Sequence, residues 1–176
     1  MDAAGGAHLS RVRRLREAFS SANERLVARL RAAEDAAAEA SVGSAWSAAQ
    51  VGWHVAAVNT RFAALIAGDV PSAKPLPQDF REQPWAEIEA AMPEKIDAPT
   101  SAHPPAGARR RDVIAALEAS GLKMARALDT LTAERGATLG VTNALVGTIN
   151  LYQVGEWAAG HVNRHVRQVA GLLEQR

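Results

Sequence analysis

The chain contains no cysteine among its 176 residues. Disulfide bonds, thiolate metal ligands and a cysteine nucleophile are therefore excluded. Aromatic residues make up only 5% of the sequence, β-branched runs are short, and no stretch alternates apolar and polar residues convincingly. Because alanine is abundant, the composition favours helix over strand. The length predicts one domain, residues 1–176, with a sizeable core.

A strong charge excess and long apolar runs are also missing. The formal net charge is +1, which by itself is not the electrostatic footprint of a nucleic-acid-binding protein. No apolar run reaches about 18 residues, so no membrane-spanning helix is expected. The first six residues show no basic segment followed by an apolar one, the pattern of a secretory signal. We therefore expect a cytoplasmic protein with neither nucleic acid nor membrane as a partner.

Apolar residues that recur every three or four positions predict four long helices. Their predicted ranges are 10–40, 47–67, 111–134 and 150–174. A short break at 41–44 follows the first helix, and residues 136–149 are rich in glycine and threonine and are expected to be extended.

Polar and glycine residues mark several of the helix ends. Ser47 and Gln50 have the spacing of a capping box at the start of the second helix. Gly68 suits a left-handed residue at its end. Gly136 is expected to end the third helix. Asn150 and Gln153 have the same cap spacing at the start of the fourth.

All eight prolines lie between the second and third helices, in residues 69–110. Proline breaks helices, so only a short helical piece near Trp85–Ala91 is expected there. The segment is too long for a simple turn. It is either a disordered linker or a crossover connection that lets the second and third helices run parallel, and its apolar residues, such as Ile88, favour a packed segment. The sequence therefore predicts an all-α fold, a four-helix bundle with a long crossover connection between helices 2 and 3.

Three of the five histidines lie in the predicted helices. His161 and His165 are four residues apart and so share one helix face, within the apolar stripe. Two imidazoles at this spacing can bind one metal ion, and His54 from the second helix would complete a tri-histidine site with an open position. The alternative is that all three are hydrogen-bonded core residues. His8 and His103 fall in segments expected to be mobile, and no role is assigned to them.

Two other residues of the fourth helix are candidates for the same site. Gln168 lies three residues after His165 and could orient its ring, with helix packing as an equal alternative. Trp157 lies one turn before His161 and is a candidate pocket wall, although core packing is the favoured interpretation. Glu156 and Glu174 do not share the histidine face, so no acid or base is assigned. Any catalysis would then come from water or a thiol at the open metal position.

Two stretches, Trp46-Ser47-Ala48-Ala49-Gln50-Val51-Gly52-Trp53-His54 and His161-Val162-Asn163-Arg164-His165-Val166-Arg167-Gln168, resemble the DinB-like superfamily, which includes metal-dependent hydrolases and thiol-dependent transferases. The resemblance implies a divalent ion (nickel, zinc or iron) on His54, His161 and His165, with helices 2 and 3 parallel. Imidazole chemistry alone does not choose the ion.

The resemblance also implies a homodimer, to which the sequence adds apolar positions, such as Val12 and Val27, outside the main stripe of the first helix. The implied function is a hydrolase or thiol-dependent transferase that acts on an unknown small molecule. The alternatives are a non-catalytic dimeric protein that binds a metal or small ligand, and a structural bundle. Fold and family alone do not choose among them.

Overall fold

The computed structural model describes residues 3–41, 43–93 and 96–174. Over these ranges it contains seven α-helices, one short 3-10 helix and three short strands. In chain order they are α1 (Ala3–Ala32), α2 (Asp35–Glu39), α3 (Ala48–Ala67), β1 (Lys74–Pro75), α4 (Trp85–Ala91), η1 (Thr100–Ala102), α5 (Arg110–Asp129), α6 (Ala133–Thr138), β2 (Leu139–Asn143), β3 (Gly147–Asn150) and α7 (Leu151–Glu174).

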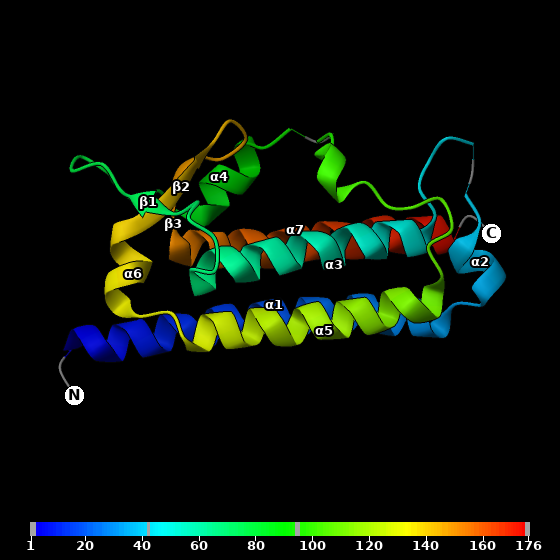
Figure 1. Cartoon of the computed structure of the whole chain (residues 1–176), viewed down its shortest axis with the longest axis horizontal. Helices are drawn as coiled ribbons and strands as arrows, with labels where there is room; N and C mark the ends of the chain where they lie inside the picture. The colour runs from blue at the N-terminus through cyan, green and yellow to red at the C-terminus, as the bar shows by residue number, and fades with distance from the viewer. Residues whose placement is uncertain (1–2, 42, 94–95, 175–176) are drawn as a thin grey trace.

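Four long helices, α1, α3, α5 and α7, lie side by side and make up the body of the molecule (Figure 1). Helix α3 packs against α5 and α7, and α1 packs against the same two helices. The colours of Figure 1 show that α3 and α5 run in one direction and α1 and α7 in the other. The connection between α3 and α5 returns along the length of the body. The predicted predominance of helix is confirmed.

The interior of this body is built from the apolar stripes that the sequence predicts. Phe19, Leu26 and Leu30 of α1 are fully buried, as are Leu117 and Leu128 of α5. Burial of each such side chain contributes roughly 1.5–3 kcal/mol.

The sequence suggested Val12 and Val27 of α1 as apolar positions in support of a homodimer, and the structure does not support this use of them. Val12 and Val27 are buried within the chain, at 9% and 6% exposure. They are therefore not available to a partner. The predicted stripe is too narrow because α1 packs against two neighbours, α5 and α7, and not against one.

The predicted ends of α3 and the start of α7 are confirmed. The Ser47 hydroxyl accepts from the backbone N–H of Gln50, whose side-chain oxygen accepts from the N–H of Ser47. Gly68 ends α3 with a φ of 89°, in the left-handed region. At α7, Asn150 and Gln153 exchange the same pair of hydrogen bonds. The short helix at Trp85–Ala91 is also present as predicted.

Two predicted helices end earlier than expected. The first begins at Ala3, before its predicted start at residue 10, and ends at Ala32; after extended Glu34 a separate helix, α2, begins. The predicted break at 41–44 includes Val42, which lies outside the described residues. The third ends at Asp129, because Thr132 accepts a hydrogen bond from the N–H of Arg135 and so caps a new helix, α6.

Gly136 lies inside α6 and does not end a helix. A Cβ atom built at Gly136 would lie 2.4–2.8 Å from ring atoms of Tyr152 on α7. The glycine is therefore required by close packing.

A small antiparallel sheet, in the order β1-β2-β3, joins the connection to the start of α7. Strands β2 and β3 form a hairpin in the segment predicted to be extended, with Val141 opposite Ile149. Strand β1 pairs Lys74 with Gly140. A further property of the described helices is that none combines the length and apolar character needed to cross a membrane.

Candidate metal centre

His54 lies on the face of α3 that is turned toward α7, and it is buried at 5% exposure. Its Nδ1 atom is 2.9 Å from the carbonyl oxygen of Ala102 in η1. Because a carbonyl oxygen only accepts, this Nδ1 must carry the hydrogen. The Nε2 atom of neutral His54 therefore presents a lone pair, and it points toward His161.

The three predicted histidines converge. The Nε2 atom of His161 lies 3.2 Å from Nε2 of His54 and 3.2 Å from Nε2 of His165. One ligand atom of each ring lies within 4.8 Å of the other two. Imidazole ligands bind zinc at about 2.0–2.1 Å, which places the nitrogens of a tetrahedral site roughly 3.3 Å apart. The spacing in this cluster therefore suits one shared ion.

Gln168 fixes the tautomer of His165. The side-chain oxygen of Gln168 lies 2.7 Å from Nδ1 of His165, so this Nδ1 donates and the Nε2 atom is left with a lone pair. Two lone pairs, from His54 and His165, then point at Nε2 of His161. A cation at their meeting point satisfies all three Nε2 atoms at once, and this donor set fits a divalent ion.

His161 itself has an unpaired polar atom. Its Nδ1 atom is buried and has no hydrogen-bond partner among the described residues. If Nε2 binds an ion, Nδ1 carries a hydrogen that no acceptor receives, which costs about 1–3 kcal/mol. His161 differs in this respect from His54 and His165, whose outer nitrogens are both bonded.

The surroundings of the cluster keep the imidazoles neutral. Burial lowers the pKa of His54 and lowers the pKa of His161 well below its ordinary value, with repulsion from the other two histidines adding to the effect. Burial also lowers the pKa of His165 to about 4, against the opposing effect of the hydrogen bond that its Nδ1 donates to Gln168. All three rings are therefore uncharged at neutral pH, the form that binds metals.

Aromatic rings pack around the cluster. The Trp46 ring centroid is 5.3 Å from that of His54, and the Phe62 centroid is 6.3 Å from that of His161. Trp157 contacts Phe62, with centroids 5.1 Å apart. Trp157 is thus placed one ring away from His161, in a position open both to a role as pocket wall and to core packing.

The two remaining histidines, which the sequence placed in segments expected to be mobile, both make contacts with the body of the protein. His8 lies in α1 and its Nδ1 atom is 2.7 Å from the Tyr152 hydroxyl. His103 follows η1, with its ring against Trp46. Neither joins the cluster of three.

Several contributors to the site were missed. The Ala102 carbonyl carries no side-chain signal and could not be found from the sequence. Trp46 and Phe62 lie eight residues to either side of His54. Trp46 opens the stretch that resembles the family, but neither ring was assigned to the site from the sequence. Glu156 faces Arg11, at 3.4 Å, in agreement with its predicted exclusion from the site.

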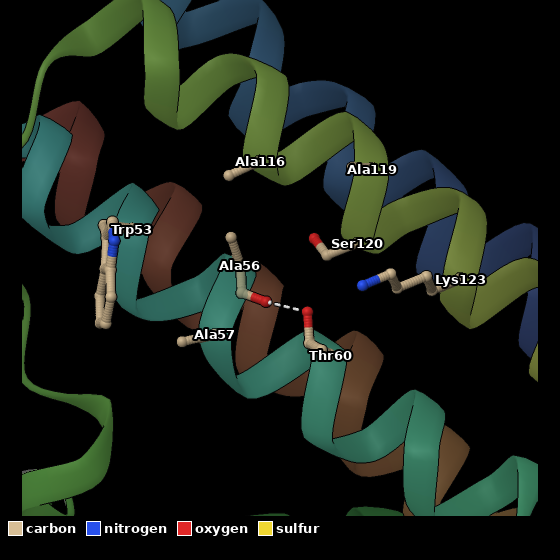
Figure 2. A pocket seen from close by; sticks show the side chains of 8 residues that line it. All are labelled: Trp53, Ala56, Ala57, Thr60, Ala116, Ala119, Ser120 and Lys123. Atoms are coloured by element: carbon tan, nitrogen blue, oxygen red, sulfur yellow. Dashed lines mark hydrogen bonds between the residues drawn. The ribbon is translucent and has the colours of Figure 1, made fainter. Parts of the chain in front are cut away.

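A shallow groove of about 300 Å³ lies between α3 and α5 (Figure 2). Small side chains line it, with Trp53 toward one end and Lys123 toward the other. None of the three histidines lines this groove, so it is distinct from the candidate metal centre.

Comparison with protein families adds to this geometry. Residues 13–169 match the family model of the DinB superfamily. Comparison with curated proteins found no match. The matched range contains all three clustered histidines and Gln168, together with the four long helices over most of their length. The chain belongs to the DinB superfamily.

Proposed function

We propose that this protein is a metal-dependent enzyme in which His54, His161 and His165 hold one divalent ion, nickel, zinc or iron. The proposed reaction is hydrolysis, or transfer to a low-molecular-weight thiol, with a small molecule as substrate. A bound ion would supply a Lewis acid with an open coordination position. The observation that carries the proposal is the convergence of three Nε2 atoms, two of them with lone pairs fixed by hydrogen bonds.

Other residues of the chain would orient the ligating histidines and control access of solvent to the ion. Gln168 holds the ring of His165, and the Ala102 carbonyl holds that of His54. The bond between His165 and Gln168 is exposed, so this side of the cluster is open to solvent and to a small molecule. Trp46 and Phe62 limit water on other sides. No carboxylate joins the histidines within the described part of the chain, so proton transfer would rely on the substrate's own groups or on water.

We also propose that the four long helices form the four-helix bundle with a crossover connection predicted from the sequence. The shared direction of α3 and α5 and the return path of the connection in Figure 1 support this proposal. A bundle core with ligands on facing helices is a common position for metal sites. The cytoplasmic location and the absence of a nucleic-acid or membrane partner stay predictions of the sequence.

A homodimer is proposed on family membership alone, because Val12 and Val27 are buried within the chain. Light scattering at micromolar concentration is expected to return twice the chain mass of 18.6 kDa. A mass of one chain would refute the dimer.

The function is tested on protein purified without a histidine tag. We expect one divalent ion per chain by metal analysis, with its identity read from anomalous diffraction. The loaded protein is then assayed against a panel of small thiols and hydrolysable esters and amides, with His161→Ala as the control. Turnover lost in the control supports an enzyme. Stoichiometric metal without turnover supports the non-catalytic alternative, and absence of metal binding refutes both.

The affinity of the protein for the metal ion is expected to depend on pH. Protons compete with the ion for the three imidazoles, so affinity falls as the pH falls. Because burial lowers the pKa of each ring, and that of His165 to about 4, the loss of affinity is expected below the ordinary histidine pKa of about 6.5. A decline in affinity whose midpoint lies below about pH 6.5 is the predicted profile. A decline centred at 6.5 or above would contradict it.

A further inference from the structure

Three polar side chains on one face of α3 bond to consecutive parts of the connection that precedes α5. The Gln50 amide donates to the Pro105 carbonyl at 3.1 Å, His54 to Ala102 at 2.9 Å, and Arg61 to Ser101 at 2.8 Å. The spacings of four and seven residues place the three on one side of the helix. Residues 101–105 are thus fastened antiparallel to α3.

This segment is itself a rigid turn. The N–H of Ala102 bonds to the Pro99 carbonyl at 2.7 Å, and that of His103 to the Thr100 carbonyl at 3.1 Å. The Ala102 side chain is completely buried. The Trp46 ring contacts both His54 and His103. The Ala102 carbonyl that faces His54 is therefore held in place by the backbone hydrogen bonds of residues 102 and 103, by the buried Ala102 side chain and by the packing of His103 on Trp46.

We propose that Gln50 and Arg61 are positioning residues for the metal centre. They hold residues 101–105 in place, so that the Ala102 carbonyl sets the tautomer and ring angle of His54. His54 has no second hydrogen-bond partner outside the histidine cluster among the described residues. If the carbonyl moved, the Nδ1 atom of His54 would lose its acceptor, and hydrogen on Nδ1 would no longer be favoured over hydrogen on Nε2. This inference rests on the proposed function, because it assigns two further residues to the same site.

Arg61 is suited to this role by the absence of a competing partner. It forms no ion pair within the described ranges, and its hydrogen bond goes to a backbone carbonyl. A guanidinium to carbonyl bond is charge-assisted, and such bonds are roughly twice as strong as neutral ones. Gln50 links the start of α3 to the connection. Its side-chain oxygen completes the capping box at Ser47, and its side-chain nitrogen donates to the Pro105 carbonyl.

The two functions of Gln50 can be separated. Gln50→Glu keeps an oxygen for the N–H of Ser47 but places a carboxylate against the Pro105 carbonyl. Arg61→Met keeps the apolar stem and removes the donor. We expect the double variant to bind Zn²⁺ up to about tenfold more weakly, because loss of a group bonded directly to a metal ligand costs about 10–100-fold and these two residues act one bond further out. Arg61→Lys, which keeps a donor, should restore part of this loss in the Gln50→Glu background.

The control is Arg16→Met, the same chemical change at an arginine that bonds to Asp129. It should leave Zn²⁺ affinity unchanged. The tautomer of His54 is read in the metal-free protein by long-range proton–nitrogen NMR. The unaltered chain should show hydrogen on Nδ1 alone, and the double variant a mixture of tautomers.

The outcomes separate the two proposals. An unchanged tautomer and unchanged Zn²⁺ affinity in the double variant overturn the positioning role, even if its melting temperature falls. If the unaltered chain binds no Zn²⁺, the proposed function fails, while the NMR comparison still decides whether Gln50 and Arg61 orient His54.

Discussion

Replacement of His161 by alanine is expected to weaken binding of Zn²⁺ or Ni²⁺ at pH 7 by more than about a hundredfold. Removal of a group that only orients a metal ligand costs about 10–100-fold, and His161 is a proposed ligand itself. Its Nε2 atom is the one that lies 3.2 Å from both other rings. Without it, two imidazoles on different helices remain to hold the ion.

The measurement is a competition titration against a chromophoric chelator, with helix content followed by circular dichroism. The variant should remain folded, because the ring that is removed includes a buried Nδ1 atom with no partner. His8→Ala is the control, since His8 bonds to Tyr152 and lies outside the cluster. Affinity and stoichiometry equal to those of the unaltered chain in a folded His161→Ala protein would exclude the tri-histidine site.

Two alanine substitutions of helical glycines are expected to change stability in opposite directions. At Gly136, a Cβ would lie 2.4–2.8 Å from the Tyr152 ring. That ring is held by its bond to His8 and by the Arg11 guanidinium, whose carbon lies 4.4 Å from the ring centroid. Overpacking of this kind costs about 1–3 kcal/mol, which exceeds or offsets the gain in helix propensity of about 1 kcal/mol.

Gly171 of α7 is the matched case. A Cβ at this position meets no atom within 4 Å, so only the helix propensity changes and the free energy of unfolding should rise by up to about 1 kcal/mol. Urea unfolding of both variants gives the comparison. If Gly136→Ala proved as stable as Gly171→Ala, the close approach of α6 to Tyr152 would be wrong.

The parts of the fold that were predicted correctly depend on residues near one another in sequence. The capping pairs at Ser47 and Asn150 need contacts across only three residues, so local patterns identify them. Gly136 was misread because the reason for it, the Tyr152 ring, belongs to a different helix. The burial of Val12 and Val27 likewise depends on two neighbouring helices, which the stripe of one helix does not reveal.

In the candidate site, too, the residues that lie near one another in sequence were predicted, and a contributor from a distant segment was not. His161, His165 and Gln168 share a helix face, and their spacing alone grouped them. His54 was joined to them by the family resemblance and by its place in an apolar stripe, and the structure brings its ring to them. The Ala102 carbonyl is a backbone atom in a connection. Nothing in the side chains of that segment indicates which carbonyl will face a histidine.

The packing of α1 against α7 has a consequence for how the protein is made. Helix α1 leaves the ribosome before the other described helices, and one of its two long neighbours, α7, is synthesised after all of them. The growing chain must therefore keep part of the apolar surface of α1 uncovered until α7 arrives. Two of the three clustered histidines arrive on that same helix. Metal capture by the proposed site would then coincide with the docking of α7, because a chain that ends before α7 offers only His54 of the three proposed ligands.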